Sequence, residues 1–496
     1  MRIAQLNTYD FAGGAERVSR ELHREYVRRG EDSWLLVGCK RGSEEGVVEI
    51  PNTSARSRWA RAWSAAANAV APLHHGQISP SWRVRRSLTR AIGEPDRSLA
   101  RALGREDFDF PGSHRLSDLM PWPPDVIHAH NLHGAVLPDG GYFDLRLLPT
   151  LSRSRPFVLT LHDAWLLSGH CGHSFECPRW EIGCGHCPDL TIYPAVRRDA
   201  TAWNWQRKQR IYTESSLDLA TPCTWLMRRV ERSMLWAGVA EARVIPHGVD
   251  LTVFRPATDP DAVRRELGFP PGARVLLFAA NGIRQNEWKD FRTLRAAVAL
   301  VAERLRDEVV FVALGERAPS EHLGRAEIRF VPYESDAYRV ARYYQASHLY
   351  VHAALAETFP NSILEALACG VPVVASAVGG VPEQVNPIER RGGQAAANGR
   401  GAPTGALVEP RDPQALADAI ELCLKDEALR RELGANAAAD AAARFDLERE
   451  VDDYLAWYRE LVERRGESKG VSSRRRARRP GLLTVPQPRA GRIGPR

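Results

Sequence analysis

Two glutamates separated by seven residues are the most chemically suggestive feature of this 496-residue chain. Glu357 lies in a polar loop after the apolar run 349–351, and Glu365 lies in a helix expected to begin at Pro360. Helical rise separates the two carboxylates by only about 8 Å along the axis, so both can face one crevice. There, carboxylates accept hydrogen bonds from vicinal hydroxyls, and the helix N-terminus favours a phosphate.

The elements that must position these glutamates form a strand, a loop, a helix and a second strand. The first strand is expected at 349–351 and the second, equally apolar, at 371–375. Between them, Gly370 stands where a helix ends in a left-handed residue. This pattern predicts a parallel βαβ unit, whose ligand belongs at the carboxyl ends of the strands.

The two glutamates, with Gly-Val-Pro-Val behind them at 370–373, resemble the nucleotide-sugar site of retaining GT-B glycosyltransferases. This is the large family, family 4, that contains bacterial mannosyl- and glucosyltransferases and sucrose synthase. The family usually has Gly where this chain has Thr358. The resemblance covers residues 1–463 and implies an α/β fold of two Rossmann-like domains facing across a cleft.

The resemblance also implies roles for individual side chains. Glu365 would hold the ribose hydroxyls of the donor, and Glu357 would hold the hydroxyls of its sugar. Lys289 and Arg284 would neutralise the diphosphate, which supplies the main catalytic need without a metal cofactor. Asn361 and Ser362, at the start of the helix that carries Glu365, are further donor-binding candidates.

Gly13 and Gly14 form a turn that opens a helix directly after the first strand, expected at 2–6. Glycines let a backbone approach a diphosphate, and the family places this loop beside the donor. The same pair is equally consistent with an ordinary turn.

His162 ends the strand expected at 157–162, so it lies at the mouth of the sheet. By resemblance it contacts the reacting sugar, whereas the alternative is a packed histidine. The separate cluster of His128, His130 and His133 is compatible with a structural or an acceptor-lining role.

The order of these motifs divides the chain. The segment 244–250, with its Pro, Gly and Asp, matches the family signature at the end of the first domain and is a hinge candidate. We expect an acceptor domain at 1–255 with insertions at 54–120 and 164–195, a donor-binding domain at 256–446, a helix at 447–463 that crosses back to the first domain, and a basic disordered tail at 464–496.

Half of the eight cysteines, Cys171, Cys177, Cys184 and Cys187, fall in one short window. The last two have the spacing of a zinc knuckle, and two more thiolates would complete a closed tetrahedral site. Such a zinc ion would brace a loop on the acceptor side and take no part in the chemistry. Disulfides or free thiols are the alternative.

Positive charge is concentrated in two segments. Residues 464–496 carry eleven Lys or Arg and one Glu, and residues 54–93 carry seven Arg and no acidic residue. In the second segment, Trp59, Trp63 and Val70 share one helical face, which is typical of a helix on an anionic membrane. A helix packed on the core fits the pattern equally well.

Composition is that of an ordinary globular protein, 44% hydrophobic and 26% charged. No apolar run is long enough to cross a membrane, and the chain opens directly as a strand, so we expect a cytoplasmic protein. If the segment 54–93 does bind a membrane, the protein would be peripheral on its inner face. The folded part is mildly acidic, which disfavours a specific nucleic-acid partner.

These observations favour an enzyme that moves a sugar from a nucleotide-diphosphate sugar to a glycan or lipid-linked acceptor with retention, in surface polysaccharide biosynthesis. A GT-B sugar-nucleotide epimerase and a non-catalytic zinc-containing binding protein are the alternatives.

Overall fold

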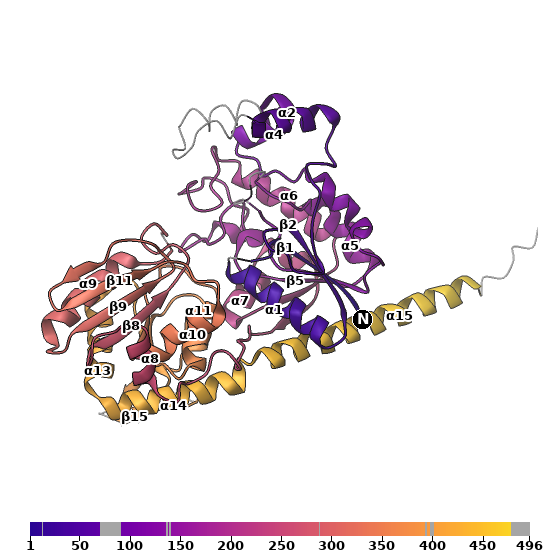
Figure 1. Ribbon diagram of the computed structural model, residues 1–496. Coiled ribbons are helices and arrows are strands. Elements are labelled where there is room, and N and C mark those ends of the chain that lie inside the picture. The colour runs from indigo at the N-terminus through magenta and orange to yellow at the C-terminus, as the bar shows by residue number, and fades with distance from the viewer. Residues whose placement is uncertain are drawn as a thin grey trace, which may run out of the picture.

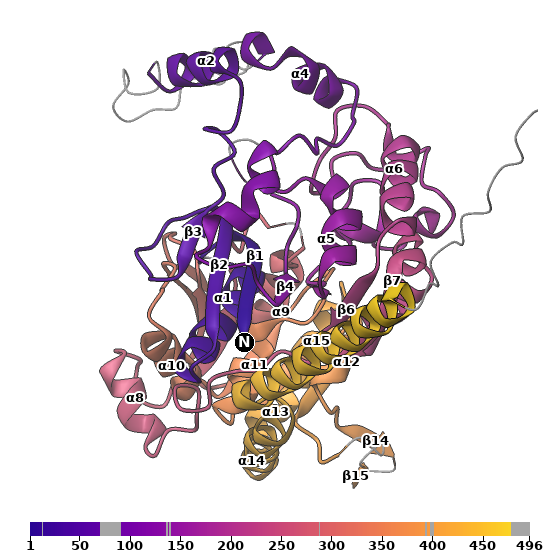
Figure 2. The same cartoon turned by 90° about the vertical axis from the view of Figure 1, so that its right-hand side faces the viewer.

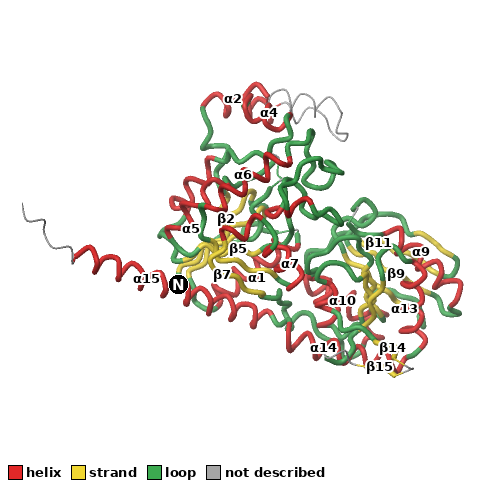
Figure 3. Tube along the Cα trace, turned by 180° about the vertical axis from the view of Figure 1, so that it is seen from behind, coloured by secondary structure: helices red, strands yellow, loops and turns green. Residues whose placement is uncertain are grey.

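The computed structural model describes residues 1–11, 13–69, 91–134, 137, 140–286, 288–391, 394–396 and 401–477. Within them the chain forms two separate, largely parallel sheets, each flanked by helices (Figures 1 and 3). This is the two-domain Rossmann-like architecture that the sequence predicts.

The first sheet has the strand order β3-β2-β1-β4-β5-β6-β7, and all of its neighbouring pairs are parallel. The chain order reverses between β1 and β4, so a crevice is expected at the carboxyl ends of these strands. The strands are β1 (Arg2–Tyr9), β2 (Asp32–Cys39), β3 (Val47–Glu49), β4 (Val126–Ala129), β5 (Phe157–Thr160), β6 (Leu217–Thr221) and β7 (Val239–Val244).

Helices of the first domain connect these strands. α1 begins at Gly14, directly after the glycine turn, and the chain leaves it through Gly30, whose φ of 80° suits a residue without a side chain. The helices are α1 (Gly14–Arg28), α2 (Arg58–Ala69), α4 (Pro95–Ala102), α5 (Leu148–Ser154), α6 (Thr201–Thr213) and α7 (Thr224–Glu231), with 3₁₀ turns η2 (Pro111–Leu119), η3 (Leu145–Leu147), η4 (Trp165–Leu167), η5 (Arg179–Glu181) and η6 (Met234–Gly238).

The second sheet has the order β10-β11-β9-β8-β12-β13-β16 and is parallel except for the edge pair of β10 and β11. Its central strands are fully buried, as continuous apolar runs require. The strands are β8 (Arg274–Ala279), β9 (Val309–Leu314), β10 (Glu321–Leu323), β11 (Ala326–Val331), β12 (Leu349–His352), β13 (Val373–Ser376) and β16 (Gly405–Val408), and a separate hairpin pairs β14 (Glu389–Arg391) with β15 (Gln394–Ala396).

Side-chain caps start several helices of the second domain. Asp290 accepts a hydrogen bond from the Thr293 N–H at the start of α9, and Asp412 accepts one from the Ala415 N–H at the start of α13. The helices are α8 (Pro260–Glu266), α9 (Phe291–Arg304), α10 (Ala337–Ala346), α11 (Asn361–Ala368), α12 (Val381–Gln384), α13 (Pro413–Lys425), α14 (Glu427–Arg444) and α15 (Leu447–Ala477).

α15 leaves the second domain and runs along the first (Figure 1). Val451, Tyr454, Trp457 and Tyr458 on this helix form one buried cluster with side chains of α1 and the first sheet. The helix continues to Ala477, so the expected boundary at 463 and the disorder expected from 464 are wrong for residues 464–477. Arg464 pairs with Glu241 of the first domain, which favours continuation of the helix; residues 478–496 lie outside the described part of the chain.

The insertion with α2 and α4 lies above the first sheet, away from the body of the domain (Figures 1 and 2). Trp59 is 58% exposed, whereas a Cβ on Gly93 would lie 2.8 Å from the Trp63 Cβ, so Trp63 packs within the insertion. Arg56 forms ion pairs with Glu94 and Asp109. The expected apolar face is therefore divided, and its last member, Val70, lies outside the described residues.

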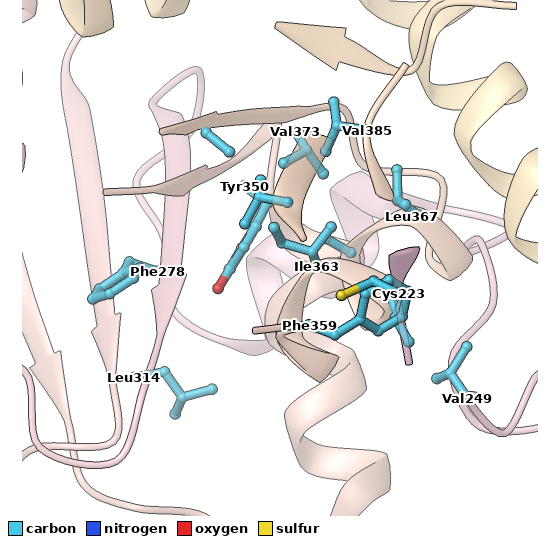
Figure 4. Packing of buried hydrophobic residues seen from close by; sticks show 14 of the residues in the cluster. Cys223, Val249, Phe278, Leu314, Tyr350, Phe359, Ile363, Leu367, Val373 and Val385 are labelled. Carbon is cyan, nitrogen blue, oxygen red and sulfur yellow. The ribbon is translucent and has the colours of Figure 1, made fainter. Parts of the chain in front are cut away.

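The largest buried cluster includes side chains of both domains. Figure 4 shows Cys223, from the loop before α7, beside Phe359 of the second domain, and the Cys223 thiol lies 3.6 Å from the Thr358 carbonyl oxygen. The two domains are thus in direct contact beside the loop that carries Glu357.

Candidate functional site

A cavity of about 170 Å³ lies between the two domains at the carboxyl ends of the strands. Four of the predicted site residues line it, Gly14 and His162 from the first domain and Glu357 and Asn361 from the second. Its volume is below the ~300–1,000 Å³ of most small-molecule sites. The two domains lie in direct contact around this cavity, which is partly open to solvent.

Glu357 follows β12, and its carboxylate lines the cavity. It forms an ion pair with Lys289, and His352 Nε2 lies 2.8 Å from its Oε1 atom. Burial raises the pKa of this carboxyl, but Lys289 and His352 outweigh burial and hold the pKa at about 2. Glu357 is therefore ionised throughout the physiological pH range.

Lys289 is held in place by backbone pairing as well as by its ion pair with Glu357. It forms an antiparallel bridge with Ala354, and its N–H donates to the Asn286 carbonyl oxygen. The ammonium group is thus positioned against Glu357 by the chain segment that follows β12.

Glu365 lies in α11, as predicted, but its carboxylate is directed to the other domain. It forms an ion pair with Arg17 of α1. Burial raises the pKa of the Glu365 carboxyl, and Arg17 opposes this effect. Glu365 is not among the side chains that line the cavity.

The other predicted residues of α11, Asn361 and Ser362, lie at its start. Asn361 donates from Nδ2 to the Gly14 carbonyl oxygen at 3.4 Å, which joins the two domains. Ser362 is the next residue of α11. Only Asn361 of the pair reaches the cavity lining.

Arg284 lies outside the cavity lining. Its guanidinium forms an ion pair with Glu316 at 2.6 Å and lies over the Phe330 ring. In this arrangement the structure brings Lys289, but not Arg284, to Glu357.

The glycine turn places its second residue in the site. Gly14 lines the cavity, whereas Gly13 caps α1 with extended backbone. A Cβ at Gly13 would lie 2.0 Å from Glu16 Oε2, so a side chain at Gly13 would collide with Glu16.

His162 lies at the floor of the cavity, just beyond β5. Its ring stacks on His247 at 4.9 Å, and its Nε2 lies 3.2 Å from His130 Nδ1. Burial and then His247 hold the pKa of His162 well below its usual range. The ring is therefore neutral at physiological pH and can exchange hydrogen bonds with a hydroxyl.

His247 also lines the cavity, although the sequence predicts only a candidate hinge for its segment. Its Nδ1 lies 3.2 Å from Glu450 Oε1 on α15, and the Gly248 N–H donates to Glu450 Oε2 at 2.7 Å. Burial raises the pKa of Glu450 to about 8. The motif at 244–250 was the sequence signal that could have identified His247 as a site residue. Its contact with α15 could be seen only in the structure.

The four cysteines of the 164–195 insertion line one small cavity together with His170. They are free thiols, and no group of three or more His, Cys, Asp or Glu side chains in the described residues is arranged to hold a metal ion as it stands. Cys184, Gly185 and His186 have consecutive positive φ values of 54°, 83° and 48°, which makes a tight loop. Burial raises the pKa of Cys184 to about 12, and Cys171 and Cys177 contribute less.

Comparison with known proteins identifies the family of the chain. The family profile "Glycosyl transferases group 1" matches residues 259–440. A D-inositol 3-phosphate glycosyltransferase of Mycobacterium avium (strain 104) is 34% identical over 381 residues, which cover 73% of this chain and 79% of that protein.

Solved structures under 25% identical share the fold. Anabaena Alr3699/HepE in complex with UDP and glucose has a TM-score of 0.55 at 17% identity, covering 93% of this chain and 100% of that one. WaaG, a glycosyltransferase involved in lipopolysaccharide biosynthesis, has a TM-score of 0.53 at 14% identity, covering 91% and 98%. The chain therefore belongs to the group 1 glycosyl transferases and is a GT-B enzyme that transfers sugar.

Proposed function

We propose that this enzyme transfers a glycosyl group from a nucleotide-diphosphate sugar to a glycan or lipid-linked acceptor, with retention of configuration, in surface polysaccharide biosynthesis. The names of similar proteins support this choice, because HepE was solved with UDP and glucose and WaaG acts in lipopolysaccharide biosynthesis. The site of transfer is the cavity between the two domains.

The observation that carries the proposal is the Glu357–Lys289 ion pair, whose carboxylate lines the same cavity as His162. An ionised carboxylate accepts hydrogen bonds from sugar hydroxyls, and Glu357 is ionised because Lys289 and His352 hold its pKa at about 2. Lys289 places a cation where the departing diphosphate develops charge, which stabilises the transition state more than the bound donor. Neutral His162 contacts the reacting sugar from the first domain.

The proposal also assigns donor contacts to Gly14, Glu365 and Arg284. Gly14 lies at the start of α1, where backbone N–H groups and the positive end of the helix dipole favour a bound diphosphate. Glu365 would hold the ribose hydroxyls once Arg17 no longer pairs with it. Arg284 would have to leave Glu316 to reach the diphosphate.

A structural zinc ion is part of the proposal for the 164–195 insertion. Cys171, Cys177, Cys184 and Cys187 line one cavity and supply a donor set that zinc prefers. The four sulfurs would have to draw together to bind it. A four-thiolate site has no open position, so the ion would brace the loop and leave the transfer chemistry to Glu357 and Lys289.

A peripheral position on an anionic membrane surface, on its cytoplasmic side, is the proposed location. The described residues contain no helix long and apolar enough to cross a membrane. Trp59, Arg58 and Arg61 of α2 are exposed on the outlying insertion, and Trp with basic residues is typical of an interfacial helix.

A donor panel tests the function. Nucleotide-diphosphate sugars are added singly, and a bound donor raises the melting temperature by mass action. We expect one donor class to stabilise the wild-type protein and to be turned over, with weaker binding in Glu365→Ala. Conversion of the donor to its epimer without transfer, or binding without turnover under any acceptor, would contradict the proposal.

A further inference from the structure

Aromatic side chains from both domains meet at one end of the cavity. Trp288 of the second domain and His173 of the first line it, and the Tyr193 ring packs edge-on against Trp288 at 6.2 Å and 70°. His173 and Tyr193 both belong to the cysteine-containing insertion 164–195. This aromatic cluster of Trp288, His173 and Tyr193 is therefore complete only when the two domains lie together.

The two rings from the first domain are supported from behind. His173 stacks on Trp225 at 5.7 Å and 10°, and its Nδ1 accepts a hydrogen bond from the Phe175 N–H at 3.0 Å. Tyr193 packs against His133 at 5.7 Å. These contacts fix the orientation of the rings before a ligand arrives, which lowers the cost of binding.

Trp288 is held close to the reacting centre by backbone contacts. The Leu355 N–H donates to the Trp288 carbonyl oxygen at 2.9 Å, and the next residue, Lys289, pairs with Glu357. A molecule on the indole of Trp288 thus lies beside the donor-binding carboxylate.

Gly172 lies close to the edge of the Trp288 indole. A Cβ at Gly172 would lie 3.5 Å from Trp288 Cη2, 3.3 Å from the Tyr193 carbonyl oxygen and 3.9 Å from Asp163 Oδ2. A larger side chain at this position would occupy the gap between the indole and the loop. Trp288, His173 and Asp163 thus line the cavity together beside Gly172.

This combination matches the chemistry of a sugar ring. The C–H faces of a pyranose are apolar and its rim carries hydroxyls, and sites for such ligands combine aromatic walls with a few placed polar groups. Asp163, which lines the cavity and is hydrogen-bonded to His133 at 2.6 Å, is an acceptor for one of those hydroxyls.

We propose that Trp288, Tyr193 and His173 form an acceptor subsite that takes the terminal sugar ring of a glycan on the indole of Trp288. The inference rests on the proposed function. It adds to that function the group that the acceptor presents, a terminal sugar ring, and the residues that recognise this ring. Because His173 and Tyr193 lie on the cysteine-containing insertion, the subsite links that insertion to acceptor binding and not to donor binding.

The test compares Trp288→Ala and Trp288→Phe with the wild type. Trp236→Ala is the matched control, since Trp236 is 44% exposed in η6 and is not among the residues that line the cavity. Each protein is assayed with the stabilising donor for transfer to methyl glycosides and maltotriose and for donor hydrolysis without acceptor. Saturation-transfer NMR with methyl α-mannoside and maltotriose in the presence of UDP measures acceptor binding directly.

Trp288→Ala should raise the acceptor KM about tenfold, with a smaller change in Trp288→Phe and none in Trp236→Ala. The donor KM and the hydrolysis rate should stay within about twofold, because stacking on the indole adds nothing to donor binding. An unchanged acceptor KM or saturation signal in Trp288→Ala, a parallel loss of donor binding in the folded Trp288→Phe, or no saturation signal from any glycoside on the wild type would overturn the subsite. A wild-type protein that no donor stabilises would overturn the proposed function instead.

Discussion

Arg17 and Glu365 form an ion pair that joins the two domains, although 347 residues separate them in the chain. The pair connects α1 of the first domain to α11 of the second, and the Glu365 side chain is only 6% exposed. Glu365 is also the predicted ribose contact, so the pair and a bound donor compete for one carboxylate. A donor whose ribose binds Glu365 would therefore have to displace Arg17 from this carboxylate.

Arg17→Ala should lower the free energy of unfolding by about 3 kcal/mol, because it leaves a buried carboxylate without its counter-ion. The matched control is Arg20→Ala on the same helix, whose partner Glu44 is more exposed, and it should cost less than about 1 kcal/mol. Urea unfolding measures both. Equal effects of the two substitutions would mean that the contact between the domains does not depend on Arg17.

Lys289→Ala should reduce the turnover number by about 100-fold to 1,000-fold with little loss of fold, because it removes charge stabilisation that matters as the diphosphate departs. Lys425→Ala, in an exposed pair on α13, is the control. Steady-state kinetics with the identified donor provide the measurement. A wild-type rate in Lys289→Ala would remove Lys289 from the site.

Glu450 should make stability depend on pH. Its folded pKa of about 8 lies above the usual value of 4.5, so its contribution to stability is full below about pH 4.5 and is lost as the pH rises through about 8. In Glu450→Gln this loss disappears. Relative to wild type, the variant should gain stability by up to about 1.4 kcal/mol per pH unit between those values. Parallel pH profiles from urea unfolding would show that Glu450 does not titrate in this way.

Protein purified without a metal-chelating tag should contain about one zinc ion per chain, because four thiolates can replace the hydration of one ion. Cys184→Ser should lower the metal content and the melting temperature while donor binding persists. Cys39→Ser, outside the cluster, is the control. Stable protein without metal, with paired or separate sulfurs, would exclude zinc.

The sequence predicted local structure well where one signal sufficed. α11 begins at Asn361, directly after Pro360, and Gly370 has the expected positive φ of 70°. β6 was missed because Asp218 interrupts its apolar run; in the fold this carboxyl is buried, with a pKa raised by burial to about 6, and lies 3.9 Å from Arg465 of α15.

Contacts between segments that are distant in the sequence could not be predicted from motif spacing or composition. The partners of Glu365 and Arg284, which are Arg17 and Glu316, lie on other elements and come close only through the fold. The Glu450–His247 contact likewise joins α15 to the hinge segment, although the whole second domain lies between them in the sequence. Residue types therefore indicated the chemistry of the site, whereas the fold decided which side chains reach the cavity.

Transfer of an isotope-labelled sugar by the wild type and by Glu357→Gln tests the central claim most directly. With the stabilising donor and a competent acceptor, wild-type protein should yield a product whose anomeric configuration, read by proton NMR, equals that of the donor. Glu357→Gln should still bind UDP but lose about 100-fold in transfer rate, because a neutral amide cannot replace the ionised acceptor of the sugar hydroxyls. An inverted product, or a wild-type rate in Glu357→Gln, would contradict the account.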